Sequence, residues 1–190
     1  MPIRSTVFKS NHYYHIYNRG NNRQKIFFER DNYLYFLTKR REHLVEKGVE
    51  IIAYCLMPNH YHLLVYLNDE NVSEFMQKLA LSYTKAINKR YKRVGSLFQG
   101  RFQSVLVDTD KYLIHLSRYI HLNPQKSYLV RKPENWEYSS YPEYINTRNG
   151  TLPNLNIILP LFSDSNAYRL FVEDYCESDE QIIKHLTFES

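Results

Sequence analysis

The sequence predicts an α+β fold in which helices pack on an antiparallel sheet of the ferredoxin-like, split βαβ type. Two observations support this prediction. The hydrophobic periodicity changes along the chain in the order strand, helix, strand, strand, helix, strand, helix, which is the split βαβ order with one helix added after the last strand. A length of 190 residues with 43% hydrophobic side chains suits one compact domain of ordinary size with a short appendage.

A turn separates the first strand from the first helix. Residues 12–18 (HYYHIYN) are rich in aromatic and branched side chains and end at the turn sequence RGNN, which predicts a strand. Asp31 then has the position of a helix cap, and Gly48 marks the end of that helix. Between them, apolar side chains recur at helical spacing: Leu34, Leu37, Leu44 and Val45.

Two strands and the clearest helix of the chain follow. Residues 49–57 and 60–67 flank Pro58-Asn59, a link so short that only a hairpin-like antiparallel pair fits. The next apolar side chains form one helical stripe, made of Val72, Phe75, Met76, Leu79, Tyr83, Ala86 and Ile87. We therefore expect a second helix with one buried face.

The last predicted strand and the third helix complete the fold. Residues 97–107 (LFQGRFQSVLV) are strand-like, because polar side chains lie on one side and Phe98 and Phe102 on the other. Asp108, Thr109 and Asp110 cap the third helix, which Pro124 must end.

Charge is distributed unevenly along the chain. Residues 1–150 carry 23 Lys and Arg against 13 Asp and Glu, a net charge of +10, whereas residues 151–190 carry 2 against 7, a net charge of −5. A basic body attracts a polyanion such as nucleic acid, and the 18 tyrosines and 10 phenylalanines supply aromatic faces that stack on unpaired bases. A tyrosine-rich core beneath a solvated basic surface is the alternative.

The same features predict the organisation and the location of the chain. We expect one domain over residues 1–145 and an acidic appendage of loop and short helices over residues 146–190. No stretch approaches the roughly 18 apolar residues of a membrane span, and the start of the chain lacks the apolar run of a signal peptide. We therefore expect a cytoplasmic protein without a membrane partner. Cys55 and Cys176 could form at most one bridge, which excludes a disulfide framework and a cysteine zinc site.

His60-Tyr61-His62 begins the third predicted strand. Side chains two apart on a strand point the same way, so both imidazoles leave one face while Tyr61 leaves the other. Two convergent imidazoles are a natural start for a divalent metal site. His-x-His alone is weak support, and a purely structural role is the alternative.

A hydroxyl and an amide share one face of the third predicted helix. At about 100° per residue, Tyr112, Tyr119 and Asn123 fall in a narrow sector beside Leu116. Asn123 lies one turn beyond Tyr119, so one helix could offer a metal ligand and a nucleophile together. The spacing does not choose between Tyr112 and Tyr119, and both could instead be core residues with their hydroxyls at the rim.

The segment CLMPNHYHLLV, residues 55–65, resembles the signature of the HUH single-tyrosine transposases of insertion sequences, and most closely that of the REP-associated tyrosine transposases. YHIYNRGNNRQKIF (residues 14–27) resembles their opening strand and loop, and RYIHLNP (residues 118–124) resembles their tyrosine helix. WEYSSYPEY (residues 136–144) also fits. Together these segments cover roughly residues 12–145 in the order of the family.

The resemblance implies a mechanism of DNA strand transfer. His60 and His62 match the paired histidines of the family, and Asn123 matches its third polar ligand, so these residues would hold Mg²⁺ or Mn²⁺. Tyr119 matches the family nucleophile. The implied enzyme is a metal-dependent transposase that cleaves and rejoins hairpin-bearing, single-stranded DNA ends through a 5′-phosphotyrosine intermediate.

Candidate DNA-binding residues lie in three places. They are Arg19 and Arg23 in the first loop, the cluster of Lys85, Lys89, Arg90 and Arg93 at the end of the second helix, and Gln99 and Arg101 on the last strand. Arginines and lysines would contact phosphates, whereas amides and aromatic rings would contact bases. His115 and His121 are interpreted as structural or DNA-facing.

The sequence leaves an alternative function and the oligomeric state open. A domesticated protein that binds hairpin DNA or RNA without cleaving it is the alternative to the enzyme, since a fold does not fix a function. The resemblance also implies a homodimer in which subunits pair through their sheets, and the active site could combine residues of two chains.

Overall fold

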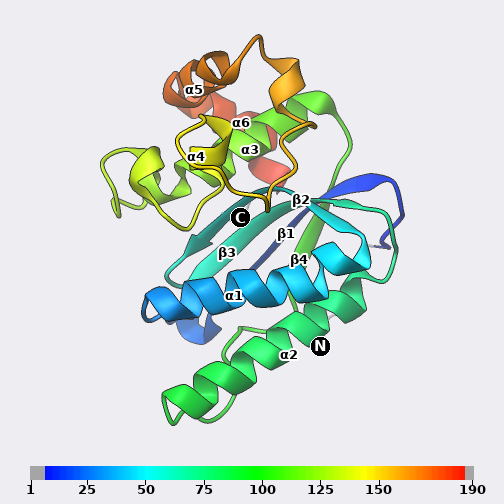
Figure 1. Ribbon diagram of the computed structural model, residues 1–190, viewed down its shortest axis with the longest axis vertical. Helices are drawn as coiled ribbons and strands as arrows, with labels where there is room; N and C mark the ends of the chain where they lie inside the picture. The colour runs from blue at the N-terminus through cyan, green and yellow to red at the C-terminus, as the bar shows by residue number, and fades with distance from the viewer. Residues whose placement is uncertain (1–6, 187–190) are drawn as a thin grey trace.

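The computed structural model describes residues 7–186 and contains a four-stranded antiparallel sheet between two layers of helices (Figure 1). The strands are β1 (His12–Arg19), β2 (Val49–Met57), β3 (His60–Leu67) and β4 (Gln103–Val107). They lie in the order β2-β3-β1-β4, and each neighbouring pair is antiparallel. The predicted split βαβ, α+β fold is confirmed. Residues 1–6 of the predicted domain and residues 187–190 of the predicted acidic appendage lie outside the described part of the chain.

One face of the sheet is covered by α1 (Arg30–His43) and α2 (Val72–Arg90), which lie below it in Figure 1. The apolar stripe predicted for α2 is confirmed, since its buried residues are Val72, Met76, Leu79, Tyr83 and Ile87. These side chains pack with Tyr14 and Ile16 of β1 in one hydrophobic cluster.

The apolar face predicted for the first helix is correct in part, since Leu44 is buried and Leu37 and Val45 pack against the core. The helix begins at Arg30 with Glu29 as its N-cap, and it buries Tyr33 and Phe36, whereas Leu34 is 38% exposed. Aromatic packing decides the orientation, because Phe27 stacks on Tyr33 at 4.4 Å between ring centroids and meets Phe36 at 5.3 Å. Gly48 does end this region, with φ of 82° after the short helix η2 (Val45–Lys47).

The strand predicted over residues 97–107 is also too long. Only Gln103–Val107 joins the sheet, while Phe98 makes an isolated bridge with Gly20. Two backbone hydrogen bonds, from Gln99 to Arg19 and from Asn21 to Leu97, tie this loop to the end of β1 instead. Gly100, with φ of 152°, lets the chain bend between the loop and β4.

The other face of the sheet carries α3 (Asp110–Lys126), with α4 (Tyr141–Tyr144), α5 (Ser165–Glu173) and α6 (Glu177–Ile183) around it (Figure 1). Thr109 caps α3, since its hydroxyl accepts a hydrogen bond of 3.1 Å from the backbone N–H of Tyr112. Pro124 does not end this helix as predicted, because it lies in the last turn and α3 continues to Lys126. Proline removes one hydrogen bond there, but the turn is buried and the backbone N–H of Ser127 still donates to the carbonyl of Asn123.

The segment after α3 covers the outer edge of β2. The backbone N–H of Leu56 donates to Tyr138 and that of Ser140 donates to Tyr54, while the indole of Trp136 donates to Leu56. The remaining short 3-10 helices are η1 (Asn21–Arg23), η3 (Pro133–Asn135), η4 (Leu159–Leu161) and η5 (Lys184–Leu186). Within residues 7–186, no helix is long and apolar enough to cross a membrane.

Candidate active site

His60 and His62 occupy the start of β3, on the face of the sheet that α3 covers. Their ring centroids are 5.0 Å apart with the planes at 84°, and His62 is only 1% exposed. The β1–β3 register places Tyr17 opposite His62 and Arg19 opposite His60. The predicted convergence of the two imidazoles on one face is therefore present.

Helix α3 brings a phenol and an amide to these histidines. The ring of Tyr119 lies 5.5 Å from that of His62, edge to face, and the Oδ1 atom of Asn123 lies 3.3 Å from Nε2 of His60. Tyr119 and Asn123 are 6% and 8% exposed. Because Pro124 leaves the helix intact, Asn123 stays one turn beyond Tyr119 on the same face.

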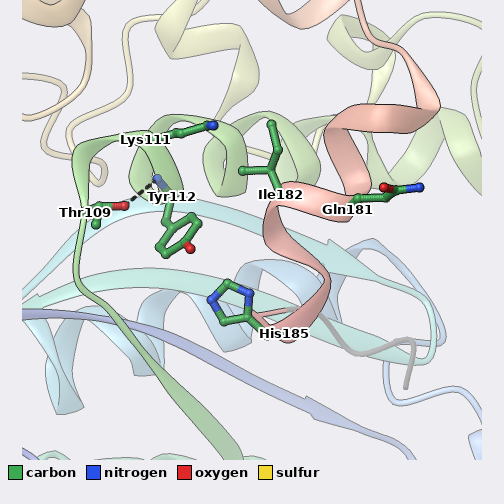
Figure 2. Close-up of a pocket in the computed structure, with 6 residues that line it drawn as sticks. All are labelled: Thr109, Lys111, Tyr112, Gln181, Ile182 and His185. Atoms are coloured by element: carbon green, nitrogen blue, oxygen red, sulfur yellow. Dashed lines mark hydrogen bonds between the residues drawn. The ribbon is translucent and has the colours of Figure 1, made fainter.

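Tyr112 lies elsewhere. Its ring packs edge to face on His185, 4.8 Å away, at a pocket of about 420 Å³ between the start of α3 and the last helices (Figure 2). Thr109, Lys111, Gln181 and Ile182 line the rest of this pocket. Of the two tyrosines that the spacing left open, the fold thus places Tyr119 beside the histidines.

The amide orientations at His60 are set by hydrogen bonds to the backbone. The amide nitrogen of Asn59 donates to the carbonyl of Arg23, and that of Asn123 donates to the carbonyl of Tyr119. Their oxygens therefore face the ring of His60, at 2.7 Å from Nδ1 and 3.3 Å from Nε2 respectively. A neutral imidazole has one N–H, so at one of these contacts two lone pairs meet, an arrangement that a cation between them would stabilise.

His62 has an orphaned polar atom. Its Nδ1 lies 3.0 Å from Nε2 of His15, whereas its Nε2 is buried without a hydrogen-bond partner. Burial lowers the pKa of His62 well below its usual value and that of His60 to about 4, so both rings are neutral near pH 7 and keep a lone pair. The described residues contain no cluster of three or more His, Cys, Asp or Glu side chains suited to a metal ion. The polar side chains that meet here are the two imidazoles and the amide of Asn123.

Two residues at this site were missed by the sequence analysis. His15, which is fully buried, and the half-buried Tyr17 lie on β1, with their ring centroids 4.8 Å apart. The ring of Tyr17 lies 6.1 Å from that of His62. The alternation of a strand puts both on one face. Nothing local in the sequence pairs β1 with β3, so their proximity to His62 could not be read from it.

The candidate DNA-binding residues separate into two regions. Arg19 lies opposite His60, and its guanidinium contacts the amide of Gln99. The exposed Arg23 ends η1, and the exposed Arg101 lies in the loop before β4. Lys85, Lys89 and Arg90 of the predicted basic cluster lie on α2, across the sheet from α3 (Figure 1), whereas Arg93 lies beyond the end of the helix. Within this cluster, Arg90 forms ion pairs of 2.7 Å with Glu29 and 3.3 Å with Asp31.

The two histidines of α3, His115 and His121, face the C-terminal helices. His121 is fully buried and contacts the hydroxyls of Tyr168 and Ser140 at 2.7 and 2.8 Å, so it is structural and not DNA-facing. His115 lies beside Arg118, whose guanidinium forms a 2.8 Å ion pair with Asp179 of α6. The acidic appendage is therefore packed against the outer side of the tyrosine helix.

Comparisons with known proteins agree on one family. A family model described as "Transposase IS200 like" matches residues 8–123. A curated protein of Haemophilus influenzae, named as a REP-associated tyrosine transposase, is 32% identical over 103 residues, or 48% of this chain and 58% of that protein. The chain thus spans less than two thirds of that relative.

A solved structure shares the fold. It is a REP-associated tyrosine transposase bound to a REP hairpin, with a TM-score of 0.63 and 18% sequence identity, and the match covers 81% of this chain and 97% of that one.

Proposed function

The chain belongs to the family of IS200-like transposases, and we propose that within this family it is a metal-dependent enzyme that cleaves and rejoins hairpin-bearing single-stranded DNA ends. The observation that carries this proposal is the meeting of His60, His62, Asn123 and Tyr119 at one end of the sheet, where Nε2 of His62 is buried without a hydrogen-bond partner. The relative named as a REP-associated tyrosine transposase and the shared fold of the hairpin-bound structure support the choice of DNA.

The donor set suits a small divalent cation. Nε2 of His60, Nε2 of His62 and Oδ1 of Asn123 would hold Mg²⁺ or Mn²⁺, and the 3.3 Å between the first and the last is close to the roughly 3 Å that separates adjacent ligands of such an ion. When bound, the ion supplies Lewis-acid polarisation of the scissile phosphodiester.

Tyr119 is the proposed nucleophile. Its phenolic oxygen forms a bond to phosphorus as the bond from phosphorus to the 3′ oxygen breaks. One fragment then carries a 5′-phosphotyrosine and the other a 3′-hydroxyl. The phenol loses one proton and the departing oxygen gains one, so the step balances without an external energy source.

DNA would approach the end of the sheet where β1 meets the loop before β4. Arg19, Arg23 and Arg101 supply positive charge there, and Gln99 supplies an amide for base contacts. The half-buried ring of Tyr17 lies on the same face as His62 and offers a stacking surface for a base. A homodimer remains part of the proposal, since β4 forms one edge of the sheet and has β1 as its only strand partner among the described residues.

The test is a cleavage assay on single-stranded hairpin DNA from the ends flanking the gene, with and without Mn²⁺. We expect wild type to form a covalent protein–DNA adduct that requires the metal. Tyr119→Phe should abolish the adduct, whereas the matched variant Tyr112→Phe, which changes a phenol on the same helix away from the histidines, should retain it.

Other outcomes would overturn parts of the proposal. An adduct that persists in Tyr119→Phe and disappears in Tyr17→Phe or Tyr112→Phe would move the nucleophile. Tight hairpin binding with no adduct under any metal condition would favour the non-cleaving, domesticated alternative.

A further inference from the structure

The two candidate ligand histidines share one arrangement. In each ring, Nδ1 lies within hydrogen-bond distance of a neighbouring side chain. For His60, the neighbour is Oδ1 of Asn59 at 2.7 Å, and for His62 it is Nε2 of His15 at 3.0 Å. The neighbours come from different elements, Asn59 from the β2–β3 turn and His15 from the adjacent strand β1. Nε2 of His60 lies 3.3 Å from Oδ1 of Asn123, and Nε2 of His62 is buried without a hydrogen-bond partner.

We propose that His15 is a positioning residue for the metal site: its Nε2 accepts the Nδ1–H of His62 and so keeps the lone pair of His62 on Nε2. The inference rests on the proposed metal dependence of the site. His15 itself does not contact DNA or metal in this arrangement, and it acts through His62 alone.

Geometry favours this proton arrangement. If His15 instead donated to His62, the proton of His62 would lie on Nε2, where a buried donor would have no acceptor. When His62 donates its Nδ1–H to His15, only a lone pair is left at Nε2 of His62. In the proposed site, that lone pair binds the cation. Both rings are 0–1% exposed, and their planes lie within 22° of each other with centroids 5.2 Å apart, so strand pairing fixes their relative position.

The chemistry explains why a second histidine is useful at this position. A ligating imidazole whose other N–H is held by an acceptor has its tautomer and ring orientation fixed, and it is a stronger base toward the metal. Loss of such a partner typically lowers metal affinity about 10- to 100-fold. His15→Phe keeps the size and flatness of the ring but removes the acceptor, so we expect a loss of that size for Mn²⁺.

The first measurement needs no metal. Long-range ¹H–¹⁵N correlation spectra of the wild-type protein, with His62 assigned through His62→Gln, report which nitrogen carries the proton. We expect His62 to be protonated at Nδ1 in wild type. A proton on Nε2 of His62 would overturn the inference.

The second measurement is the affinity of the full chain for Mn²⁺ alone, by titration calorimetry. We expect weaker binding by His15→Phe and partial recovery in His15→Gln, whose side-chain oxygen can accept the same hydrogen bond. The matched control is His121→Phe, which removes another fully buried histidine. His121 contacts Tyr168 and Ser140 instead of the site, so this variant should bind Mn²⁺ as tightly as wild type does.

The outcomes separate the inference from the function it rests on. If wild type binds Mn²⁺ and His15→Phe, folded by circular dichroism, binds it equally well, the role of His15 is refuted while the metal site stands. If wild type binds no Mn²⁺, the proposed metal dependence fails, and the positioning role fails with it.

Discussion

His121 gives the fold a dependence on pH that can be worked out from its surroundings. The ring is fully buried between α3, Tyr168 of α5 and Ser140, and both its nitrogens contact hydroxyls. Burial lowers the pKa of His121 from 6.5 to about 3. Between these two values the unfolded chain binds a proton that the folded chain excludes, so stability is complete above about pH 6.5 and falls as the pH is lowered.

The loss at about pH 5 follows directly. Each pH unit between the two pKa values costs about 1.4 kcal/mol, so His121 alone should remove about 2 kcal/mol of unfolding free energy between pH 7 and pH 5. His121→Gln keeps an amide that can bond to the hydroxyls but does not titrate in this range. Between pH 7 and pH 5, the unfolding free energy of the variant should therefore fall by about 2 kcal/mol less than that of wild type, whatever the stability of the variant at pH 7.

Urea denaturation at the two pH values measures this difference. His12→Gln serves as the control, because His12 is exposed on β1. It should show the pH dependence of wild type. If His121→Gln lost as much stability as wild type between pH 7 and pH 5, the reasoning from burial would be refuted.

Three further predictions concern stability and DNA binding. Arg148→Met should destabilise the fold by about 3 kcal/mol, because it leaves the carboxylate of Glu143, only 4% exposed, without the ion pair of 2.6 Å; chemical denaturation measures the loss, and adding Glu143→Gln should recover much of it. Thr109→Ala should cost about 1 kcal/mol in the same assay through loss of the α3 N-cap, and an unchanged midpoint would contradict the capping role. Arg19→Ala should weaken hairpin binding and reduce the slope of log affinity against log salt concentration by about one. Arg90→Ala should have a smaller effect, because Arg90 already pairs with two carboxylates. Equal effects of the two variants would place the α2 cluster in the DNA interface.

Local patterns predicted the element order well, since periodicity depends on neighbouring residues only. The α2 stripe is one example: a helix repeat needs no knowledge of its partner, and the buried side chains of α2 are a subset of those predicted. The errors arose where tertiary contacts compete with a local signal. Phe27 turned α1 so that Tyr33 and Phe36 are buried rather than Leu34, and the ties between Arg19 and the loop before β4 shortened the last strand.

Local repeats were enough to predict the fold class, the shared face of His60 and His62, and the helix that carries the candidate nucleophile, because strand and helix periods specify which side chains share a face. Long-range packing determined which side chains lie next to these two histidines. Packing of α3 on the sheet placed Tyr119 rather than Tyr112 beside the histidines, and the pairing of β1 with β3 placed His15 behind His62. These contacts join residues far apart in the chain, and they depend on strand register and helix docking, which no local repeat encodes.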